Sequence, residues 1–494
     1  MFSGDWLFKR SSLTPNHIAV RDAGYSEGWT YKQLNDRAEH LAGYFLSKGV
    51  CKGDRIALLA VNHICYFDFL FACYKIGAIF VPLNWRLATA ELDYIIKDCN
   101  PKIIGVHSTF NHVSIIDLST HIIKINSLYY KEMKYAKRAK SKDFHGEQHL
   151  PVVLIYTGGT TGNPKGVILS RENILMNALN TIVSWNLSSA EITLTSLPMF
   201  HTGGLNALTL PILLAGGTVV YNEDFEAEQA ARYLDLYSCT IALFVPTMYH
   251  SMIATPYFQQ SSFPSMKAFL SGGAPCPIEI YHAFEKKGLP FKEGYGLSEA
   301  GPNNFFISID ESIQKKGSVG RPMILNNVKI MDGELLISEA EKVGELLISG
   351  AHTFSGYWHN EEAYQDVYQN GWLYTGDLAK MDEEGYFYIV GRKKDMIISG
   401  GENVYPIEVE QALLSHPSVE EAAVIGVKDE KWGEMVTAFI VSSCSNLQTV
   451  ELVNYCESLL AKYKIPKVFH FIDSLPKTHV GKIDKKCLQQ KGAV

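Results

Sequence analysis

The densest group of chemically useful residues lies between two apolar segments, at 156–166, and reads YTGGTTGNPKG. Its glycines let backbone N–H groups approach an anion, while the threonine hydroxyls and one lysine add donors and positive charge. We interpret it as a loop that holds phosphate groups. It is not a Walker A loop, because Pro164 precedes the lysine and a strand-like segment follows, which disfavours P-loop kinases and GTPases. A plain surface turn does not explain so many hydroxyl groups around one lysine.

Six further segments combine glycines, hydroxyl groups and single charged residues. They are LPMFHTGGL (197–205), SGGAP (271–275), GYGLSEAG (294–301), YTGDL (374–378), GRKKDMIISGGENVYPIEVE (391–410) and PKTHVGKIDK (476–485). Each is ambiguous when taken alone. His201 would more often be a packed histidine than a catalytic one, and Glu299 and Lys482 would more often be solvated charges.

Taken together and in this order, the seven segments resemble the signature motifs of the adenylate-forming superfamily, which includes acyl-CoA synthetases, adenylation domains and firefly luciferase-like enzymes. The resemblance covers nearly the whole chain. Where the family usually has Ser or Thr, this chain has Gly158, which can offer only backbone contacts. The resemblance implies an enzyme that uses ATP and Mg²⁺ to convert a carboxylic acid to acyl-AMP and then transfers the acyl group to coenzyme A.

The resemblance also implies roles for individual residues. Tyr295 would stack on adenine, Ser298 would contact phosphate, and Asp377 and Arg392 would hold the ribose. The catalytic residues would be Lys482, Glu299 and His201, with Glu299 also holding Mg²⁺. The full set assigned to ATP or AMP is Thr157, Gly158, Gly159, Thr160, Thr161, Gly162, Lys165, Gly273, Ala274, Pro275, Gly294, Tyr295, Gly296, Ser298, Asp377 and Arg392.

In the second half-reaction the family rotates its C-terminal domain, which removes the catalytic lysine so that the thiol can reach the acyl carbonyl. The hinge would be Lys394. The tunnel for coenzyme A would be lined by Gly400, Gly401, Glu402 and Asn403, and the acyl pocket by His201, Gly203 and Gly204.

The sequence indicates the substrate less clearly than it indicates the type of reaction. No Asp or Glu occurs between Glu191 and Glu223, and a buried substrate ammonium without a partner is costly, which argues against an amino acid. The glycine-rich lining favours a medium- or long-chain fatty acid. An aromatic acid, as in coumarate, benzoate or succinylbenzoate ligases, is the alternative, and a luciferase-like oxygenase stays open.

Two other functional classes agree less well with the sequence. GLSEA at 296–300 nearly matches the G-x-S-x-G elbow of serine hydrolases, but its last position is Ala. A non-catalytic nucleotide- or acyl-binding scaffold would not need all of the charged residues expected in the active site, which are Lys165, Glu299, Asp377, Arg392 and Lys482.

The composition of the chain indicates which partners and which cellular compartment to expect. The chain has 494 residues, 47% of them hydrophobic, and a net charge of −7, so nucleic acid is a poor partner. Nine scattered cysteines without a C-x-x-C pair predict reduced thiols and a cytoplasmic location. We expect no signal peptide, because the N-terminus lacks an apolar run of the required length. We expect no transmembrane segment, because the uncharged stretch 192–222 contains two prolines and two glycine pairs. A homodimer is compatible with the sequence.

Periodicity predicts the elements that position these residues. A helix at 31–48 and a strand–helix–strand unit at 55–60, 66–76 and 79–82 indicate a parallel sheet, whereas 107–150 is predicted to be a surface connection. We therefore predict an α/β fold with a large N-terminal domain of mixed sheets and a small β-rich subdomain (1–393), followed by a small mobile α+β domain (394–494). The last domain would contain helices at 407–414 and 450–463 and strands at 422–427 and 437–441.

Overall fold

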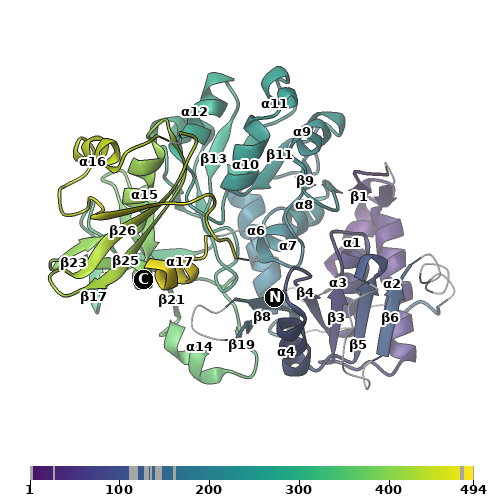
Figure 1. The fold of residues 1–494 in the computed structure, drawn as a ribbon. Helices are drawn as coiled ribbons and strands as arrows, with labels where there is room; N and C mark the ends of the chain where they lie inside the picture. The colour runs from purple at the N-terminus through teal and green to yellow at the C-terminus, as the bar shows by residue number, and fades with distance from the viewer. Residues whose placement is uncertain are drawn as a thin grey trace.

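The protein is described here from a computed structural model, which describes residues 4–25, 28–110, 121–126, 129, 133, 136–139, 147–158, 163–444, 446–478 and 483–492. Two large sheets form most of the N-terminal part, and a β-rich unit and a small C-terminal domain follow (Figure 1). The predicted α/β architecture is confirmed.

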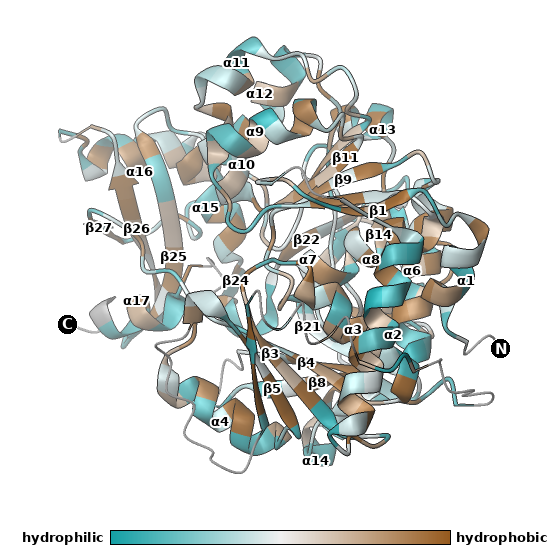
Figure 2. Cartoon of the chain, turned by 90° about the vertical axis from the view of Figure 1, so that its right-hand side faces the viewer, coloured by the Kyte–Doolittle hydropathy of each residue, from teal (hydrophilic) through white to brown (hydrophobic). Residues whose placement is uncertain are grey.

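The first large sheet has the order β19-β8-β7-β4-β3-β5-β6. Its strands are β3 (Arg55–Leu59), β4 (Ile79–Leu83), β5 (Ile103–His107), β6 (His121–Ile125), β7 (Pro151–Thr157), β8 (Lys165–Ser170) and β19 (Gly356–Tyr357). The central strands are almost continuously apolar (Figure 2), as expected when helices cover both faces of a parallel sheet. The associated helices are α1 (Trp6–Leu13), α2 (Tyr31–Ser47), α3 (Cys65–Ile76) and α4 (Thr89–Cys99), with the short η1 (Ser108–Phe110).

The second large sheet has the order β13-β12-β11-β9-β10-β1-β2. Its strands are β1 (Ile18–Asp22), β2 (Gly28–Thr30), β9 (Ile192–Thr195), β10 (Thr218–Tyr221), β11 (Ile241–Phe244), β12 (Ala268–Ser271) and β13 (Phe291–Glu293). All residues of α3 are buried, and they join one apolar core with side chains from both large sheets. The helices of this region are α6 (Arg171–Trp185), α7 (Thr202–Asn206), α8 (Thr209–Ala215), α9 (Ala227–Leu236), α10 (Pro246–Ile253), α11 (Pro256–Gln260), α12 (Ile278–Lys286) and α13 (Ile309–Gln314).

The β-rich unit is an antiparallel sheet of order β17-β16-β18-β21-β20, with β22 paired to β21. Its elements are β16 (Asn327–Asp332), β17 (Leu335–Ile337), β18 (Gly344–Ser349), α14 (Glu361–Val367), β20 (Tyr368–Gln369), β21 (Trp372–Met381) and β22 (Phe387–Arg392). The short pair β14 (Phe305–Phe306) and β15 (Arg321–Pro322) lies before it. The turn between β21 and β22 contains Gly385 at φ +83°, a conformation that favours glycine in hairpin turns.

The C-terminal domain begins after the short helix η2 (Lys393–Asp395) and has its own apolar core. Its elements are β23 (Ile397–Ser399), β24 (Glu402–Val404), α15 (Pro406–Leu414), β25 (Val419–Asp429), β26 (Gly433–Ser442), α16 (Thr449–Glu457), β27 (Val468–Phe471) and α17 (Lys485–Gly492).

Two element predictions were wrong. The segment 107–150 is more than a connection, because it contains β6, whose Ile123 and Ile125 are buried beside β5. The helix predicted at 450–463 ends at Glu457. There the hydroxyl of Ser458 donates to the carbonyl of Tyr455 (2.7 Å), a local bond of the kind that competes with helix continuation.

Candidate active site

The glycine- and threonine-rich loop joins two antiparallel strands, as predicted. Thr157 ends β7 and pairs with Lys165, which begins β8. Gly158 is exposed, and a Cβ atom there would meet nothing within 4 Å, so its backbone is open to a ligand. The other predicted phosphate-binding residues of the loop lie outside the described residues; they are Gly159, Thr160, Thr161 and Gly162.

A tyrosine connects this loop to Glu299. The Nζ atom of Lys165 lies 5.1 Å from the centroid of the Tyr357 ring, and the Tyr357 hydroxyl donates a 2.8 Å hydrogen bond to Oε1 of Glu299. Strand β19 places Tyr357 beside Val167 of β8. Burial and the adjacent carboxylate raise the pKa of Tyr357, so its hydroxyl stays a donor. Lys165 and Glu299 therefore border one site, and Tyr357 is a residue that the motifs did not indicate.

Glu299 fits the requirements of a magnesium ligand. Its Oε2 atom has no protein partner among the described residues, although Oε1 accepts from Tyr357. Among the described residues, no group of three or more His, Cys, Asp or Glu side chains could hold a metal ion. Mg²⁺ commonly binds to one or two carboxylates together with substrate phosphates, so a single carboxylate beside a phosphate-binding loop suits it.

The predicted ribose residues form a compact group with Tyr295. The Tyr295 hydroxyl donates to Oδ2 of Asp377 (2.5 Å), and Nε of Arg392 lies 2.6 Å from Oδ1 of the same carboxylate. Asp377 of β21 and Arg392 of β22 are direct cross-strand partners. Burial, followed by the adjacent carboxylate, holds the pKa of Tyr295 well above its ordinary value. The hydroxyl of Tyr295 is thus fixed, and its ring packs edge-on against Phe305 at 5.9 Å.

The SGGAP segment forms an exposed loop at the carboxyl end of β12. Gly273 has φ +82°, a conformation that favours glycine, and it is followed by the exposed Ala274 and Pro275. Beneath the loop, Glu293 accepts hydrogen bonds from the Cys276 N–H (3.2 Å) and the Tyr281 hydroxyl (2.7 Å). Burial raises the pKa of Glu293 to about 8. No sequence motif pointed to this supporting carboxyl group.

The GYGLSEAG segment, which follows β13, folds back on itself. A Cβ atom at Gly296 would lie 2.2 Å from the carbonyl group of Pro302, so only glycine fits there. Ser298 is buried, whereas Gly294 is half-buried at the end of the strand. This tight return lets the segment place Tyr295 against Asp377 and Glu299 against Tyr357.

His201 is the N-cap residue of α7, and the next residues of the segment line a small cavity. Its Nδ1 atom accepts a 3.2 Å hydrogen bond from the Gly203 N–H, so the neutral ring carries its proton on Nε2. A Cβ atom at Gly204 would lie 2.2 Å from the Pro198 carbonyl oxygen. Both glycines line the cavity, together with residues of β9, α8 and β11. The cavity volume is about 10 Å³, which is room for about one water molecule.

The described C-terminal residues predicted to act lie in the short helix η2 and in one hairpin. The catalytic candidate Lys482 lies outside the described residues. Gly400, Gly401, Glu402 and Asn403 form the exposed β23–β24 hairpin, with φ values of +62° and +85° at the two glycines. Lys394 lies in η2, directly after Lys393, whose Nζ atom is 2.8 Å from Oε2 of Glu345 in β18.

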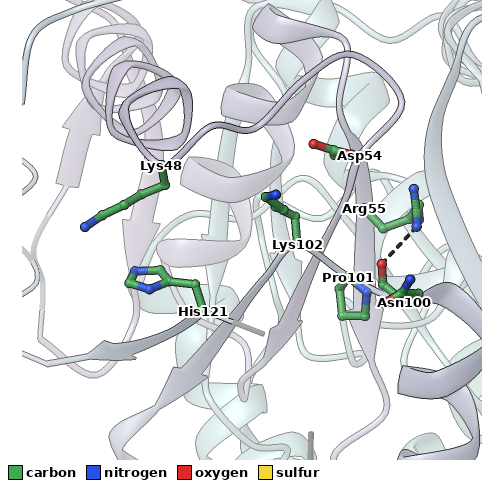
Figure 3. Close-up of a pocket in the computed structure, with 7 residues that line it drawn as sticks. All are labelled: Lys48, Asp54, Arg55, Asn100, Pro101, Lys102 and His121. Carbon is green, nitrogen blue, oxygen red and sulfur yellow. Dashed lines mark hydrogen bonds between the residues drawn. The ribbon is translucent and has the colours of Figure 1, made fainter. Parts of the chain in front are cut away.

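A larger hollow of about 410 Å³ lies elsewhere, at the amino ends of β3, β5 and β6. Figure 3 shows that its basic side chains do not converge: Arg55 turns to the Asn100 carbonyl group (2.9 Å), while Lys48 and His121 lie on the other side. Ligands of parallel α/β sheets bind at the carboxyl ends of the strands, where the motifs lie. This hollow is therefore not the active site.

Comparison with known proteins agrees with this geometry. Residues 7–358 match the model of the AMP-binding enzyme family, and residues 408–482 match that of the AMP-binding enzyme C-terminal domain. The chain belongs to the AMP-binding enzyme family. Family membership confirms the predicted resemblance.

Several curated relatives match over almost their whole length. A feruloyl-CoA synthase of an Amycolatopsis species is 37% identical over 98% of this chain and 97% of its own. An indoleacetate–CoA ligase of Aromatoleum aromaticum is 34% identical, with the same coverage of both chains. A long-chain-fatty-acid–CoA ligase of Mycobacterium tuberculosis is 32% identical over 98% of each chain.

A solved structure shows the same fold with ligands. The o-succinylbenzoate coenzyme A synthetase of Bacillus subtilis, in complex with ATP and a magnesium ion, has a TM-score of 0.87 and 31% identity, covering 97% of this chain and 98% of its own. The protein studied here is therefore an AMP-forming acid–thiol ligase that uses ATP, Mg²⁺ and coenzyme A. Within the described ranges, no helix has the length and apolar character needed to cross a bilayer.

Proposed function

We propose that this ligase activates an aromatic carboxylic acid. The observation that carries the proposal is the similarity to two aryl-acid ligases, the feruloyl-CoA synthase at 37% identity and the indoleacetate–CoA ligase at 34% identity, both over 98% of this chain. The cavity beside His201 has a volume of only about 10 Å³, so the side chains that line it must move apart for a ring as well as for an acyl chain.

The prediction of a medium- or long-chain fatty acid has less support. It has in its favour the relative from Mycobacterium tuberculosis, whose name specifies a long-chain fatty acid. A long chain would need the side chains lining the cavity, such as Leu197, Leu208 and Leu243, to move further apart than a flat ring would need. Fatty acids therefore remain the second candidate.

In the first half-reaction, the carboxylate of the acid would attack the α-phosphate of ATP, forming acyl-AMP and releasing pyrophosphate. The 157–165 loop would hold the β- and γ-phosphates, and Asp377 with Arg392 would hold the ribose. Glu299 would hold Mg²⁺, which supplies positive charge beside the phosphates. Lys482 would bridge the carboxylate and the α-phosphate. Positioning and charge neutralisation would carry the step.

In the second half-reaction, the thiol of coenzyme A would attack the acyl carbonyl and expel AMP. The C-terminal domain would first rotate about Lys394, which withdraws Lys482 and brings the Gly400–Asn403 hairpin to the site. Contacts on either side support this location of the hinge: Lys393 is tied to Glu345 of the β-rich unit, and Ile397 begins the C-terminal sheet. The division into 1–393 and 394–494 is part of this proposal.

A pyrophosphate-release assay tests the substrate class. Purified enzyme, ATP and Mg²⁺ are mixed with benzoate, cinnamate, indoleacetate, hexanoate or palmitate, with and without coenzyme A. We expect the highest kcat/KM for an aromatic acid. A highest kcat/KM for palmitate would show that the fatty-acid candidate is correct.

A further inference from the structure

The predicted ribose ligand Asp377 lies in a bulge of β21. Strand β18 has one residue between its paired positions Glu345 and Leu347, whereas β21 has three, residues 375–377, between the partners of these two positions. Bulges are frequent beside active sites, where they change the direction of a side chain. The direction of the Asp377 carboxylate therefore depends on the contacts that hold this bulge.

Two successive residues of β18 hold the bulge. The hydroxyl of Thr375 donates to the Leu346 carbonyl oxygen (2.7 Å) and accepts from the N–H of Asp377 (3.1 Å). Gly376, at φ +71°, donates its N–H to Oε1 of Glu345 (3.2 Å). The Leu346 contact uses only the backbone of β18, whereas the Glu345 contact uses a side chain. Glu345 therefore fixes, through its carboxylate, the residue directly before Asp377.

The same carboxylate binds a lysine beside the proposed hinge. Its Oε2 atom lies 2.8 Å from Nζ of Lys393, which directly precedes Lys394. The side chain of Glu345 is 12% exposed and that of Lys393 is 60% exposed. The residue before Lys393, Arg392, binds the Asp377 carboxylate at 2.6 Å. Two successive basic residues thus bind the two carboxylates that shape the predicted ribose site.

We propose that Glu345 is a positioning residue of the ribose site. Its carboxylate directs Asp377 through the N–H of Gly376, and Lys393 holds that carboxylate in the required orientation. This inference rests on the proposed function, because it takes Asp377 to be the ribose ligand. It adds that a lysine beside the hinge changes nucleotide affinity through Glu345. By thermodynamic linkage, nucleotide binding strengthens the Glu345–Lys393 contact in return.

The test measures how well the enzyme distinguishes AMP from 2′,3′-dideoxy-AMP, which lacks both ribose hydroxyl groups. The quantity is the Kd for the dideoxy nucleotide divided by the Kd for AMP, both from isothermal titration calorimetry. We expect Glu345→Ala to lower this ratio roughly threefold to tenfold, the size of one neutral hydrogen bond, chiefly through weaker AMP binding. Glu345→Gln keeps an oxygen for the Gly376 N–H and should lower the ratio less than Glu345→Ala does.

Two lysine variants test the contact beside the hinge. Lys393→Met should lower the ratio by the smaller factor that an exposed ion pair contributes, about twofold to fivefold. Lys380→Met is the matched control, because Lys380 of β21 pairs with Glu341 at 2.6 Å, a residue with no predicted role at the site. The control should leave the ratio unchanged. An unchanged ratio in Lys393→Met as well would overturn the role of that lysine.

The dideoxy nucleotide separates positioning from a structural role. A generally weakened fold would lower the affinity for both nucleotides and leave the ratio unchanged, so an unchanged ratio in Glu345→Ala would overturn the inference. If Glu345→Ala does not fold, Glu345→Gln decides: a ratio equal to that of Lys380→Met would overturn the inference, and a lower one would support it. If the parent enzyme binds both nucleotides equally, or if Asp377→Asn leaves the ratio unchanged, the ribose assignment of the proposed function fails, and the inference fails with it.

Discussion

The group formed by Tyr295, Asp377 and Arg392 allows a quantitative test of nucleotide binding. The test is the substitution Asp377→Asn. Asp377 is 5% exposed, and its carboxylate is held at 2.5 Å by the Tyr295 hydroxyl and at 2.6 Å by Arg392. An asparagine keeps the size of the side chain but lacks the negative charge. That charge balances Arg392, and it would strengthen any hydrogen bond that a ribose hydroxyl group donates to Asp377.

The magnitude follows from the loss of charge. A hydrogen bond to a charged group contributes about 1.5–3 kcal/mol, and each 1.4 kcal/mol is a tenfold change in Kd. If Asp377 accepts one bond from the ribose, Asp377→Asn should weaken AMP binding by about 10- to 100-fold. The assay is isothermal titration calorimetry with AMP, which needs no catalysis.

Two further variants complete the experiment. Tyr295→Phe removes only the hydroxyl group that orients Asp377, so we expect less than a tenfold loss. Asp382→Asn is the matched control, because Asp382 pairs with Lys315 at 2.8 Å in the same β-rich unit and contacts no predicted site residue. The ribose assignment would be refuted if Asp377→Asn bound AMP as tightly as the parent enzyme while remaining folded.

Four other predictions address the remaining parts of the site. Lys482→Ala should abolish pyrophosphate release yet leave transfer from supplied acyl-AMP to coenzyme A largely intact; equal loss of both half-reactions would contradict the two-orientation mechanism. Lys394→Pro should do the reverse, because proline fixes φ near −65°, and normal transfer to coenzyme A in a folded variant would argue against this hinge. Tyr357→Phe removes the 2.8 Å bond to Glu299 and should raise the Mg²⁺ concentration needed for half-maximal pyrophosphate release severalfold, whereas an unchanged requirement would separate Tyr357 from the metal site. Glu293, whose pKa burial raises from 4.5 to about 8, holds a proton in the folded state that the unfolded chain has released. The free energy of unfolding should therefore fall between pH 5 and pH 8 by an amount that Glu293→Gln removes, as urea titrations at both pH values would show; the same fall in the variant would assign it to other groups.

Elements with strong local signals could be predicted from the sequence. The helix α2 begins where Thr30 accepts from the Gln33 N–H (3.2 Å), and it ends before Gly49 at φ +75°, and both residues mark helix ends by their type. Strands β3 and β4 were predicted to be parallel because a helix separates them in the sequence, and they pair in parallel. Such signals lie within about twenty residues of the element that they define.

Contacts between distant segments could not be predicted in this way. Tyr357 is 58 residues from Glu299, and it reaches the site only because the two-residue strand β19 adds to the edge of β8. A strand of two residues is too short to show a pattern of alternating hydrophobic and polar residues. Glu293 was missed for a similar reason: it ends a three-residue strand, and its partners Cys276 and Tyr281 belong to the loop and helix that precede it.

The proposed hinge and one of the predicted ribose-binding residues, Arg392, lie in one short segment of chain. Arg392 ends β22 and holds Asp377, and the next residue, Lys393, is tied to Glu345 at 2.8 Å. The β-rich unit thus holds the chain up to residue 393 by cross-strand pairing and ion pairs. The first strand of the C-terminal sheet begins at Ile397. A rotation that preserves both sets of contacts must be absorbed by residues 394–396, so substitutions at Lys394 should alter domain movement without displacing the carboxylate of Asp377, the predicted ribose ligand.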